Sequence, residues 1–552
     1  MSELLIEGPK ESKLDIVEVH LLNDKKNPSY PMDAAARYVY FSKMGGFITP
    51  EQFISTPLDN PAHYGAGGFE GVRVYYTPYG TAFPELENNI VRLMLSTIAF
   101  NDIIQDVALT ERRKEDFKEA KVMQPTARQL FENACKAYHE MQTTYYKDVP
   151  FQYATMEVTK LNGDKNLIPL NLQLCAKIGD EMHQFSMREV DTIMKVLAYT
   201  SGLVSIDHFP NGLEMVMAGY FRPFFWVSGE GLIETDKNGE KIAKGGLKVP
   251  TGGKVVYFAA ATLPWGKYLE DRYYETGIDV LYAPYPRIGC DMPTDKKVAG
   301  NYVNSALNIN LAKKMGFGEI LAFKGDRIVE GSAENIYVVM PAANGKHVVF
   351  VPPVSDGPLP GTTRDRVIRV LEHMQHEGKV EIVYESPTKE QVEKACAVLL
   401  SGTGAQLIHV REITEDDNLA ELIKVSKLGS EEQTPDQKTV TIRKESTCQR
   451  KFLINNGKKH DIIDEIQRGY ERLVLTPSVL RPVYNIDIDA FAKTLGMEAT
   501  DFVPKAVVND YRAGMMRDYK NCIYDTQRML RTTANVIQAG FEKKGLLLRK
   551  TA

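Results

Sequence analysis

The sequence predicts an α+β fold in two domains, with a helical insertion in the first domain and a helical extension at the C-terminus. Residues 15–80 alternate apolar and polar positions between Gly and Pro, which is typical of strands and hairpins. After residue 277, strand-like and helix-like segments mix irregularly, and this favours a barrel-like α+β domain over a regular βαβ repeat. Apolar residues at helical spacing recur within about 102–215 and over 474–552.

The first domain is expected to span residues 1–263. Its initial strands include ARYVYFSKMGGFITP and GVRVYYTPYG, and the helical spacing of ELENNIVRLMLSTIAFNDI follows. The insertion at about 102–215 contains TARQLFENACKAYHEMQ and REVDTIMKVLAYT, which both have helical periodicity. Two apolar segments, MAGYFRPFFWVSG and KVVYFAAATLPWG, then predict strands, the second of them buried on both faces.

The second domain is expected over residues 277–473, after an interdomain loop at 264–276 that contains a Pro-Trp-Gly break. Its strand-like segments are GIDVLYAP, EILAFKG, NIYVVM, HVVFVPP and AVLLSGTG, and its helix-like segments are NSALNINLAKKMGFG and the stretch from Thr362. A polar stretch at 427–450 predicts a linker or surface excursion. The extension at 474–552 predicts long helices that pack on the protein itself or, alternatively, on another subunit.

Composition argues against several classes of protein. The 67 basic and 72 acidic residues give a net charge of −5 without a long run of one sign, which argues against nucleic-acid and membrane-surface partners. The N-terminus lacks a basic region followed by an apolar core, and no window approaches the roughly 20 apolar residues of a membrane span, so we expect a cytoplasmic protein. Six cysteines without a CxxC pair argue against a disulfide framework and a zinc site, and no metal is expected.

Three side chains suit the chemistry of one cofactor, pyridoxal phosphate. Lys297 and Tyr302 lie in KVAGNY, and Glu330 lies in VEGSAEN. A lysine amine can form a Schiff base with the aldehyde of this cofactor, and a carboxylate facing the pyridine nitrogen can keep that nitrogen protonated. The alternatives are a surface lysine at 297 and a solvent-facing glutamate at a strand end.

Two segments offer groups that can hold a phosphate. In LPGTTRD, a glycine turn and the hydroxyls of Thr362 and Thr363 precede a helical pattern, and amides at a helix N-terminus bind anions. In SGTG, residues 401–404, a second turn follows an apolar strand. The alternatives are an ordinary N-capped helix and an ordinary turn.

These segments together resemble the fold-type IV pyridoxal-phosphate enzymes and, within them, the branched-chain amino acid aminotransferases. The resemblance implies a small α/β domain and a larger barrel-like α/β domain that binds the cofactor. Eight segments carry it in the same order along the chain: HYG with FEGVR at 63–73, Arg92-Leu93, GYFRP at 219–223, LPWGKY at 263–268, KVAGNY at 297–302, EGSAEN at 330–335, LPGTTRD at 359–365 and SGTGA at 401–405.

The resemblance implies how the cofactor is held. Lys297 would form the internal aldimine and then move the proton between the substrate Cα and the cofactor C4′. Tyr302 would hydrogen-bond the phenolic oxygen of the cofactor, and Glu330 would pair with the pyridinium nitrogen. The phosphate would be held by charge-assisted bonds from Arg92, Thr362, Thr363 and Thr403, together with the amides near Leu359.

The resemblance also implies a substrate site. The α-carboxylate would bind the amides of Thr403 and Gly404, beside Ala405, and the hydroxyl of Tyr220. Arg222 would bind the distal carboxylate of glutamate. The wall for an aliphatic side chain would comprise Tyr64, Phe69, Trp265 and Tyr268, supported by Arg73. Without the resemblance, these aromatic residues would be interpreted as core residues.

The implied activity is transamination of leucine, isoleucine and valine with 2-oxoglutarate, which yields branched-chain 2-oxo acids and L-glutamate. We expect a homo-oligomer, a dimer or higher, that acts in branched-chain amino acid biosynthesis. The alternatives are a D-amino acid or amine transaminase, an aminodeoxychorismate lyase, and a non-catalytic assembly protein on this scaffold. The chain departs from the family in the 128 positions between Arg92 and Tyr220, which imply the insertion.

Overall fold

The computed structural model describes a subset of the chain, and these residues divide into two compact units. Unit 1 comprises residues 1–268, 296–300 and 468–552, and unit 2 comprises residues 269–295 and 301–467. The described residues are 39–44, 46–48, 53, 64–77, 80–97, 117–123, 152–160, 165–171, 174–178, 181–185, 187–200, 216–228, 232–235, 237–244, 256–265, 268–287, 294, 296–341, 345–416, 449–474 and 479–482.

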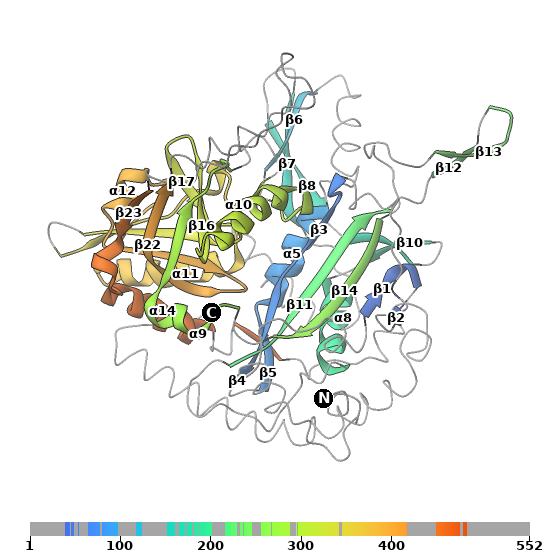
Figure 1. Cartoon of the computed structure of the whole chain (residues 1–552). Coiled ribbons are helices and arrows are strands. Elements are labelled where there is room, and N and C mark those ends of the chain that lie inside the picture. The colour runs from blue at the N-terminus through green and yellow to red at the C-terminus, as the bar shows by residue number, and fades with distance from the viewer. Residues whose placement is uncertain are drawn as a thin grey trace, which may run out of the picture. The chain divides into compact units, whose positions relative to one another are not determined.

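The main sheet of unit 1 is antiparallel and has the strand order β2-β1-β14-β11-β4-β5-β24, with β3 also paired to β11 (Figure 1). The apolar strands β11 and β14 are central because both of their faces can be buried. The strands are β1 (Val39–Phe41), β2 (Gly46–Ile48), β3 (Gly67–Phe69), β4 (Val72–Thr77), β5 (Gly80–Pro84), β11 (Val216–Val227), β14 (Val256–Pro264) and β24 (Leu480–Pro482), and the 3-10 turn η1 (Ser42–Met44) joins the first two.

Aromatic packing and two helices form the core of unit 1. The rings of Phe41 and Trp226 stack with centroids 5.7 Å apart, and Tyr257 packs against both. Helix α5 (Leu86–Thr97) and helix α8 (Met187–Thr200) contribute buried apolar side chains at helical spacing. Both helices were predicted, α5 from its period and α8 from REVDTIMKVLAYT, and both predictions are confirmed.

The prediction of a helical insertion at 102–215 is wrong for most of its described residues. Apart from α8, they form strands: the meander β6 (Phe117–Met123), β7 (Gln152–Lys160) and β8 (Lys165–Asn171), and the hairpin of β9 (Leu174–Ile178) and β10 (Glu181–Phe185). The physical reason is visible in the sequence. Strand β7 alternates the apolar residues Ala154, Met156 and Val158 with polar ones, and Asn162-Gly163, after β7 in the sequence, is a dipeptide typical of hairpin turns. The segment TARQLFENACKAYHEMQ lies outside the described residues.

Unit 2 contains a closed sheet. The pairings run β17-β16-β15-β22-β21-β18 and return from β18 to β17 through Glu330↔Asn335, so these strands form a barrel. Strand β15 is parallel to β16 and β22, and the other pairings of the barrel are antiparallel. The strands are β15 (Ile278–Tyr282), β16 (Glu319–Lys324), β17 (Arg327–Glu330), β18 (Asn335–Met340), β21 (Ala397–Gly402) and β22 (Gln406–Asp416).

Further strands and helices cover this barrel. Strands β19 (His347–Phe350) and β20 (Val380–Val383) extend it beyond β18, and β23 (Gln449–Leu453) pairs with β22. The helices are α9 (Asp271–Thr276), α10 (Tyr302–Lys314), α11 (Thr362–His376) and α12 (Lys389–Glu393), with the 3-10 turns η4 (Val354–Asp356) and η5 (Ile454–Gly457). Helix α14 (Asp461–Val474) and the 3-10 turn η3 (Ala299–Asn301) each contain residues of both units. Helix α9 lies within the segment expected as an interdomain loop.

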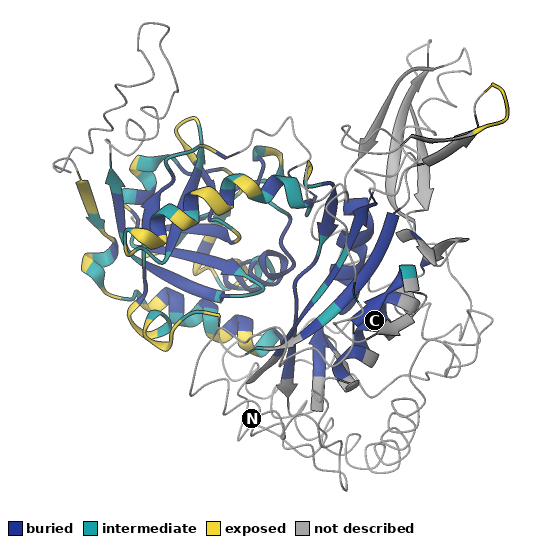
Figure 2. Cartoon of the chain, turned by 45° about the vertical axis from the view of Figure 1, so that its right-hand side comes forward, coloured by how far each residue is buried: buried dark blue, intermediate teal, exposed yellow. Residues whose placement is uncertain are grey.

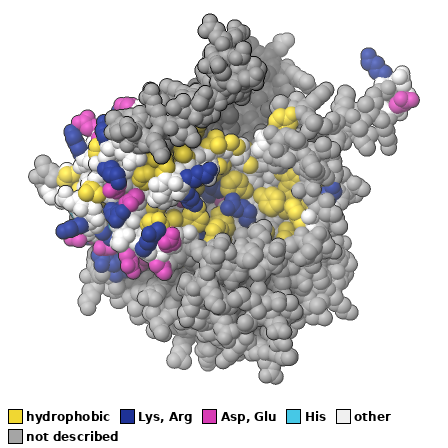
Figure 3. Space-filling view, viewed as in Figure 1, with side chains coloured by type: hydrophobic (Ala, Val, Ile, Leu, Met, Phe, Trp, Pro, Cys, Tyr) yellow, Lys and Arg dark blue, Asp and Glu magenta, His cyan; other side chains and the backbone are white. Residues whose placement is uncertain are grey.

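Burial follows the strands in each unit. In Figure 2 the described strands of the main sheets are mostly buried, whereas exposed residues gather on helices and turns of unit 2. Figure 3 shows acidic and basic side chains intermixed on the visible face of unit 2. Among the described residues, no helix is long and apolar enough to cross a membrane. The α+β fold class is confirmed, but the predicted helices after residue 482 lie outside the described part.

Candidate active site

Strand β3 holds the backbone around Lys297. The amide of Phe69 donates to the carbonyl of Lys297 at 3.1 Å, and Gly68 forms an antiparallel bridge with Val298. A Cβ at Gly68 would lie 2.5 Å from the Phe225 ring and 3.1 Å from the Lys297 carbonyl oxygen. Glycine is therefore the residue that lets this lysine segment approach the strand.

Helix α5 holds the backbone amide of Lys297. The Lys297 amide donates to Ser96 Oγ at 2.9 Å, and that hydroxyl donates to the Arg92 carbonyl at 2.8 Å. Both backbone groups of Lys297 are thus hydrogen-bonded within unit 1. Its half-buried side chain carries the amine to 5.1 Å from the centroid of the Phe69 ring.

Aromatic and cationic side chains surround this lysine in unit 1. The Arg222 guanidinium lies 4.6 Å from the Phe69 centroid and 5.2 Å from that of Tyr220, and its Nη2 is 3.3 Å from the Tyr220 hydroxyl. Cations over ring faces at these distances are attracted by the ring quadrupole. We call the following residues the lysine cluster: Phe69, Arg73, Tyr220, Arg222, Trp265, Tyr268 and Lys297.

Arg73 joins the aromatic members of the lysine cluster. This fully buried guanidinium lies 5.5 Å from the ring centroids of both Tyr220 and Trp265, and its Nη1 donates to the Trp265 carbonyl at 2.8 Å. The rings of Tyr220 and Trp265 meet edge to face at 5.0 Å, and Tyr268 follows at 5.7 Å from Trp265. Tyr64 is 38% exposed. The arrangement offers an aromatic surface with a guanidinium and a phenol on it.

Arg92, the residue expected at the phosphate, makes a bidentate ion pair in this structure. Its Nε and Nη2 each lie 2.7 Å from a carboxylate oxygen of Glu70, and Asn89 donates to the same carboxylate at 2.9 Å. All three residues are buried. Binding a phosphate through either of those two nitrogens of Arg92 would displace Glu70.

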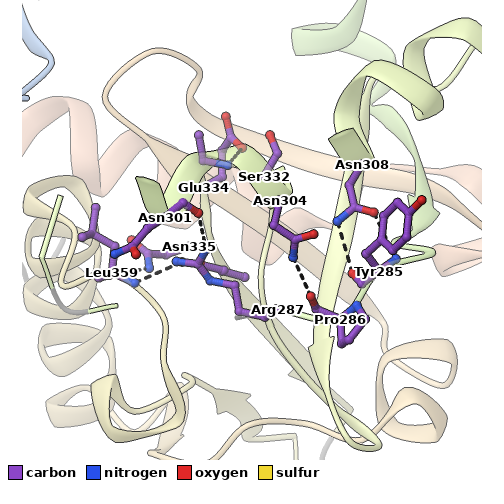
Figure 4. A network of polar contacts seen from close by, with 12 residues as sticks. Tyr285, Pro286, Arg287, Asn301, Asn304, Asn308, Ser332, Glu334, Asn335 and Leu359 are labelled. Carbon is purple, nitrogen blue, oxygen red and sulfur yellow. Dashed lines mark hydrogen bonds and ion pairs between the residues drawn. The ribbon is translucent and has the colours of Figure 1, made fainter. Parts of the chain in front are cut away.

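Glu330 is one of the buried carboxylates among the described residues of unit 2. It ends β17 at the pairing that closes the barrel, and it is 4% exposed. Its Oε1 lies 2.5 Å from Arg287 Nε, and its Oε2 accepts the amide of Leu359 at 3.0 Å. Asn335 Nδ2 donates to the Leu359 carbonyl at 2.8 Å (Figure 4). Glu330 and the LPGTTRD segment are therefore joined by one direct hydrogen bond, and Asn335 provides a second bond to the same segment.

The N-terminus of α11 follows that contact. A Cβ at Gly361 would lie 2.2 Å from Asn335 Oδ1, so glycine permits the close approach of this turn to β18. Gly361 is the N-cap and provides no side-chain cap. Arg364 donates to the Pro352 carbonyl at 2.9 Å, and burial lowers the pKa of its guanidinium from the ordinary value.

A turn between β21 and β22 carries Thr403, Gly404 and Ala405. It is tight, because Gln406 adopts a left-handed φ of 59° directly after it. Ser401, at its start, shares a hydrogen bond of 2.9 Å with the Tyr337 hydroxyl. Thr403 and Gly404 are half-buried, and Ala405 is buried.

The residues of unit 2 fit a phosphorylated pyridine. The hydroxyl of Thr363 is buried without a hydrogen-bond partner among the described residues, and Thr363 is only 2% exposed. The first-turn amides of α11 also lack a side-chain cap. An anion accepting from this hydroxyl and these amides would satisfy both, and the Glu330 carboxylate is of the kind that holds a ring N–H.

The structure thus brings the predicted residues together in two sets. In unit 1 it joins Lys297 with the aromatic residues, Arg73 and Arg222, and in unit 2 it joins Glu330 with the segment that begins at Leu359. Sequence reasoning missed Arg287, Asn335, Ser96 and Glu70 as partners. Asn335 and Glu70 lie inside the quoted motifs, so a signal existed for them. For Arg287 and Ser96 we find no comparable signal in the sequence.

Comparisons with known proteins agree with this chemistry. Residues 240–413 match the family described as amino-transferase class IV. The branched-chain-amino-acid aminotransferase of Escherichia coli (strain K12) is 30% identical over 198 residues, which are 36% of this chain and 57% of that protein. A probable branched-chain-amino-acid aminotransferase of Aquifex aeolicus is 37% identical over 123 residues, 22% of this chain and 37% of that protein. The chain therefore spans 57% of the length of the Escherichia coli relative it matches.

Similar solved structures include two aminotransferases. The branched-chain aminotransferase of Thermoproteus uzoniensis, solved with norvaline, has a TM-score of 0.48 at 20% identity, over 81% of this chain and 100% of that one. The branched-chain amino acid aminotransferase of Thermobaculum terrenum, solved in its PLP form, has a TM-score of 0.46 at 15% identity, over 81% and 99%. The family match itself contains Lys297, Tyr302, Glu330 and the LPGTTRD segment. Residues 240–413 are thus similar to the class IV aminotransferases, a family that depends on pyridoxal phosphate.

Proposed function

We propose that this protein transfers the amino group of leucine, isoleucine or valine to 2-oxoglutarate, giving branched-chain 2-oxo acids and L-glutamate. The observation that supports this most is the double anchoring of Lys297 by β3 and α5, beside the mixed aromatic and cationic surface of the lysine cluster. Pyridoxal phosphate, when bound, supplies an aldehyde that links to amines and a ring that withdraws electrons.

Lys297 moves the proton in this proposal. With the cofactor bound, its Nζ would act as the base that takes the proton from the substrate Cα, which requires the amine to be neutral. The backbone amide and carbonyl of Lys297 are both hydrogen-bonded, so its amine would act at the end of a side chain that β3 and α5 anchor.

In unit 2 the proposal assigns binding and proton-holding roles. Glu330 keeps a proton on the pyridine nitrogen, and Tyr302 donates to the phenolic oxygen. The first-turn amides of α11 and the hydroxyls of Thr362 and Thr363 bind the phosphate, with Thr403. The orphaned hydroxyl of Thr363 supports this assignment.

The substrate is held by two kinds of contact in this proposal. Its α-carboxylate binds the Thr403 and Gly404 amides and the Tyr220 hydroxyl, and its aliphatic side chain packs on the aromatic residues of the lysine cluster. Arg222 binds the distal carboxylate of glutamate or 2-oxoglutarate through charge-assisted hydrogen bonds. The distance of 3.3 Å between Arg222 Nη2 and the Tyr220 hydroxyl supports a shared carboxylate-binding patch.

The decisive experiment is a single-turnover absorption measurement. Protein reconstituted with pyridoxal phosphate is mixed with L-leucine in the absence of any oxo acid, and the visible band of the bound cofactor is followed. We expect the band to convert to the near-ultraviolet band of pyridoxamine phosphate, and 2-oxoglutarate to restore it.

Two controls sharpen this experiment. Lys297→Ala should bind the cofactor weakly and show no conversion, and D-leucine should leave the wild-type band unchanged. Conversion by D-leucine or by a simple amine, but not by L-leucine, would overturn the substrate class. A wild-type protein that takes up no cofactor at all would overturn the transaminase proposal.

A further inference from the structure

Three asparagines line one face of helix α10. Asn301 precedes the helix, and Asn304 and Asn308 follow at spacings of three and four, which place residues above one another on a helix surface. Asn301 and Asn308 are buried, and Asn304 is partly exposed. Buried amides of this kind need hydrogen-bond partners, because an unpaired one is costly.

The partners are three consecutive residues after β15. Asn308 Nδ2 donates to the Tyr285 carbonyl at 3.2 Å, and its Oδ1 accepts the Tyr285 amide at 3.1 Å. Asn304 Nδ2 donates to the Pro286 carbonyl at 2.6 Å. Arg287 Nη1 donates to the main-chain carbonyl of Asn301 at 3.4 Å, so Asn301 takes part through its backbone and not through its side chain (Figure 4). We call these contacts the asparagine ladder.

The asparagine ladder ends at Arg287, the residue that contacts Glu330. Arg287 is buried, and its amide donates to the Phe323 carbonyl of β16 at 2.8 Å. Its Nε lies 2.5 Å from Glu330 Oε1. Because a proline has no amide hydrogen, the carbonyl is the only backbone group of Pro286 that can be tied down, and Asn304 takes it.

We propose that Asn304 and Asn308 are positioning residues that hold Arg287, and through it the Glu330 carboxylate, in register with Tyr302 at the start of the same helix. The inference rests on the proposed function, since it concerns the two groups assigned to the pyridine nitrogen and the phenolic oxygen. A helix rises 1.5 Å per residue, so Asn304 and Asn308 stand about 3 and 9 Å along the axis from Tyr302. Helix α10 thereby carries Tyr302 and also holds, through Arg287, the Glu330 carboxylate of β17.

Loosening the ladder has a consequence for the alignment of Glu330. When Arg287 shifts, the Glu330 carboxylate loses one of its two fixed oxygens, and a carboxylate no longer aligned with the ring nitrogen keeps that nitrogen protonated less completely. A positive ring nitrogen favours loss of the proton from the nitrogen that joins the lysine to the cofactor. With less positive charge on the ring, the nitrogen that joins the lysine to the cofactor loses its proton only at a higher pH.

The test is a spectroscopic pH titration of the reconstituted protein, with cofactor affinity as a second readout. Asn304→Ala removes the contact to Pro286, and we expect it to raise the midpoint of the visible titration by about 0.5 to 1 pH unit. It should also weaken pyridoxal phosphate binding roughly three- to tenfold, as expected for one lost hydrogen bond. Asn308→Ala should have the larger effect, because it leaves two backbone groups of Tyr285 unpaired.

A matched control lies on the same helix. Asn310 is exposed, and Asn310→Ala should leave the titration midpoint and the affinity at the wild-type values. Arg287→Lys keeps the charge but has no planar fork, so it should reproduce the shift of Asn304→Ala although the contacts of Asn304 and Asn308 are intact. If Asn308→Ala fails to fold, Asn304→Ala decides, since it removes a single bond from a partly exposed side chain.

The outcomes separate this inference from the proposed function. A wild-type protein that responds to L-leucine, together with an unshifted midpoint in Asn304→Ala, would overturn the positioning role and leave the transaminase proposal standing. A lowered unfolding temperature with an unshifted midpoint would mean that the ladder serves stability alone, and would also overturn it. A wild-type protein without bound cofactor would overturn both.

Discussion

At the scale of single residues, the lysine cluster combines an aromatic surface with a guanidinium group. Phe69, Tyr220 and Trp265 offer aromatic faces to an aliphatic chain, and Arg222 adds a guanidinium over Phe69 at 4.6 Å. Such a surface can accept an apolar side chain and a carboxylate in turn. Arg222 alone should therefore distinguish 2-oxoglutarate, which has a second carboxylate, from the branched-chain substrates of the proposed reaction.

Arg222→Gln should affect the two substrates unequally. A charged hydrogen bond is worth about 1.5–3 kcal/mol, so the KM for 2-oxoglutarate should rise roughly ten- to a hundredfold. The KM for a branched-chain 2-oxo acid should change by less than about threefold, since that substrate has no second carboxylate. Steady-state kinetics with each oxo acid measure this difference.

The matched control is Arg272→Gln. Arg272 is an exposed arginine paired with Glu270, and both KM values should stay unchanged when it is replaced. An equal loss for both oxo acids in Arg222→Gln would show that Arg222 supports the fold of the cluster and does not read the second carboxylate.

A second residue-scale feature is a buried histidine on β22. His409 is 2% exposed, and its Nε2 would lie 2.6 Å from a Cβ at Gly277, so the ring fills the space that this glycine leaves. Burial, with a smaller contribution from Lys459, lowers the pKa of His409 from 6.5 to about 4. The folded protein therefore keeps this imidazole neutral where the unfolded chain would protonate it.

The free energy of unfolding should fall as the pH drops from about 6.5 to 4, because His409 binds a proton in the unfolded state and stays neutral in the folded state. Above pH 6.5 the ring is neutral in both states and contributes no pH dependence. The loss is at most about 3 kcal/mol, from 1.36 kcal/mol per unit of pKa difference. Thermal unfolding at several pH values measures it.

The comparison is between two histidine variants. His409→Gln should flatten the pH dependence of unfolding in this range, whereas His376→Gln, at an exposed position of α11, should leave it as in the wild type. A pH dependence that persists unchanged in His409→Gln would refute the assignment.

At the scale of elements, α11 shows how a helix start is placed. Its first turn follows Gly361, whose approach to Asn335 leaves no room for a side chain, and Leu359 just before it is held by Glu330 and Asn335. The anion-binding end of the helix is thus positioned by contacts to the barrel strands β17 and β18. Displacing this turn should weaken phosphate binding without removing any group that binds phosphate.

Gly361→Ala tests this. The backbone φ of −70° suits alanine, so the effect comes from the collision of the new Cβ with Asn335 Oδ1 at 2.2 Å. Overpacking of this kind costs about 1–3 kcal/mol, and we expect the dissociation constant of pyridoxal phosphate to rise roughly tenfold. Titration of the cofactor-free protein measures it.

Gly345→Ala serves as the control for this variant. It strains a backbone φ of 78° but meets no atom within 4 Å, so it should lower stability and leave cofactor affinity unchanged. Equal affinities of wild type and Gly361→Ala would show that the start of α11 does not bind the phosphate.

Sequence patterns predicted the elements of unit 2 well and those of the insertion badly. NIYVVM became β18 residue for residue, because buried strands of β-branched residues are unambiguous. The alternation in β7 and the Asn162-Gly163 dipeptide are typical of a hairpin, but the prediction for the insertion rested on the helical periodicity of TARQLFENACKAYHEMQ and REVDTIMKVLAYT. The Glu330–Arg287 pair could not be predicted, because it joins residues 43 positions apart that become neighbours only when the barrel closes.

At the scale of the whole molecule, the proposed cofactor should stabilise the fold by mass action. A ligand at a hundred times its dissociation constant adds about 2.7 kcal/mol to the free energy of unfolding. Pyridoxal phosphate should therefore raise the thermal unfolding temperature in a concentration-dependent way, and Lys297→Ala should reduce the effect because its covalent link is lost. Differential scanning fluorimetry measures both.

Pyridoxal without the phosphate provides the comparison for this shift. It should stabilise the protein far less, since it cannot satisfy the Thr363 hydroxyl and the α11 amides. A shift of the same size with pyridoxal would remove the phosphate site from the proposal.

The division of the chain has a consequence for how such proteins can exchange parts. Residues 296–300 belong to unit 1, but residues 269–295 and 301–467 on either side belong to unit 2. A recombination that replaces residues 269–467 as one continuous gene fragment would also replace residues 296–300. The new lysine segment would then have to form its backbone hydrogen bonds with β3 and Ser96 of the recipient protein. The recombinant protein would keep this site only where the lysine segment of the donor fits β3 of the recipient. The lysine segment and β3 should therefore be inherited together, although 230 positions separate Gly67 from Lys297.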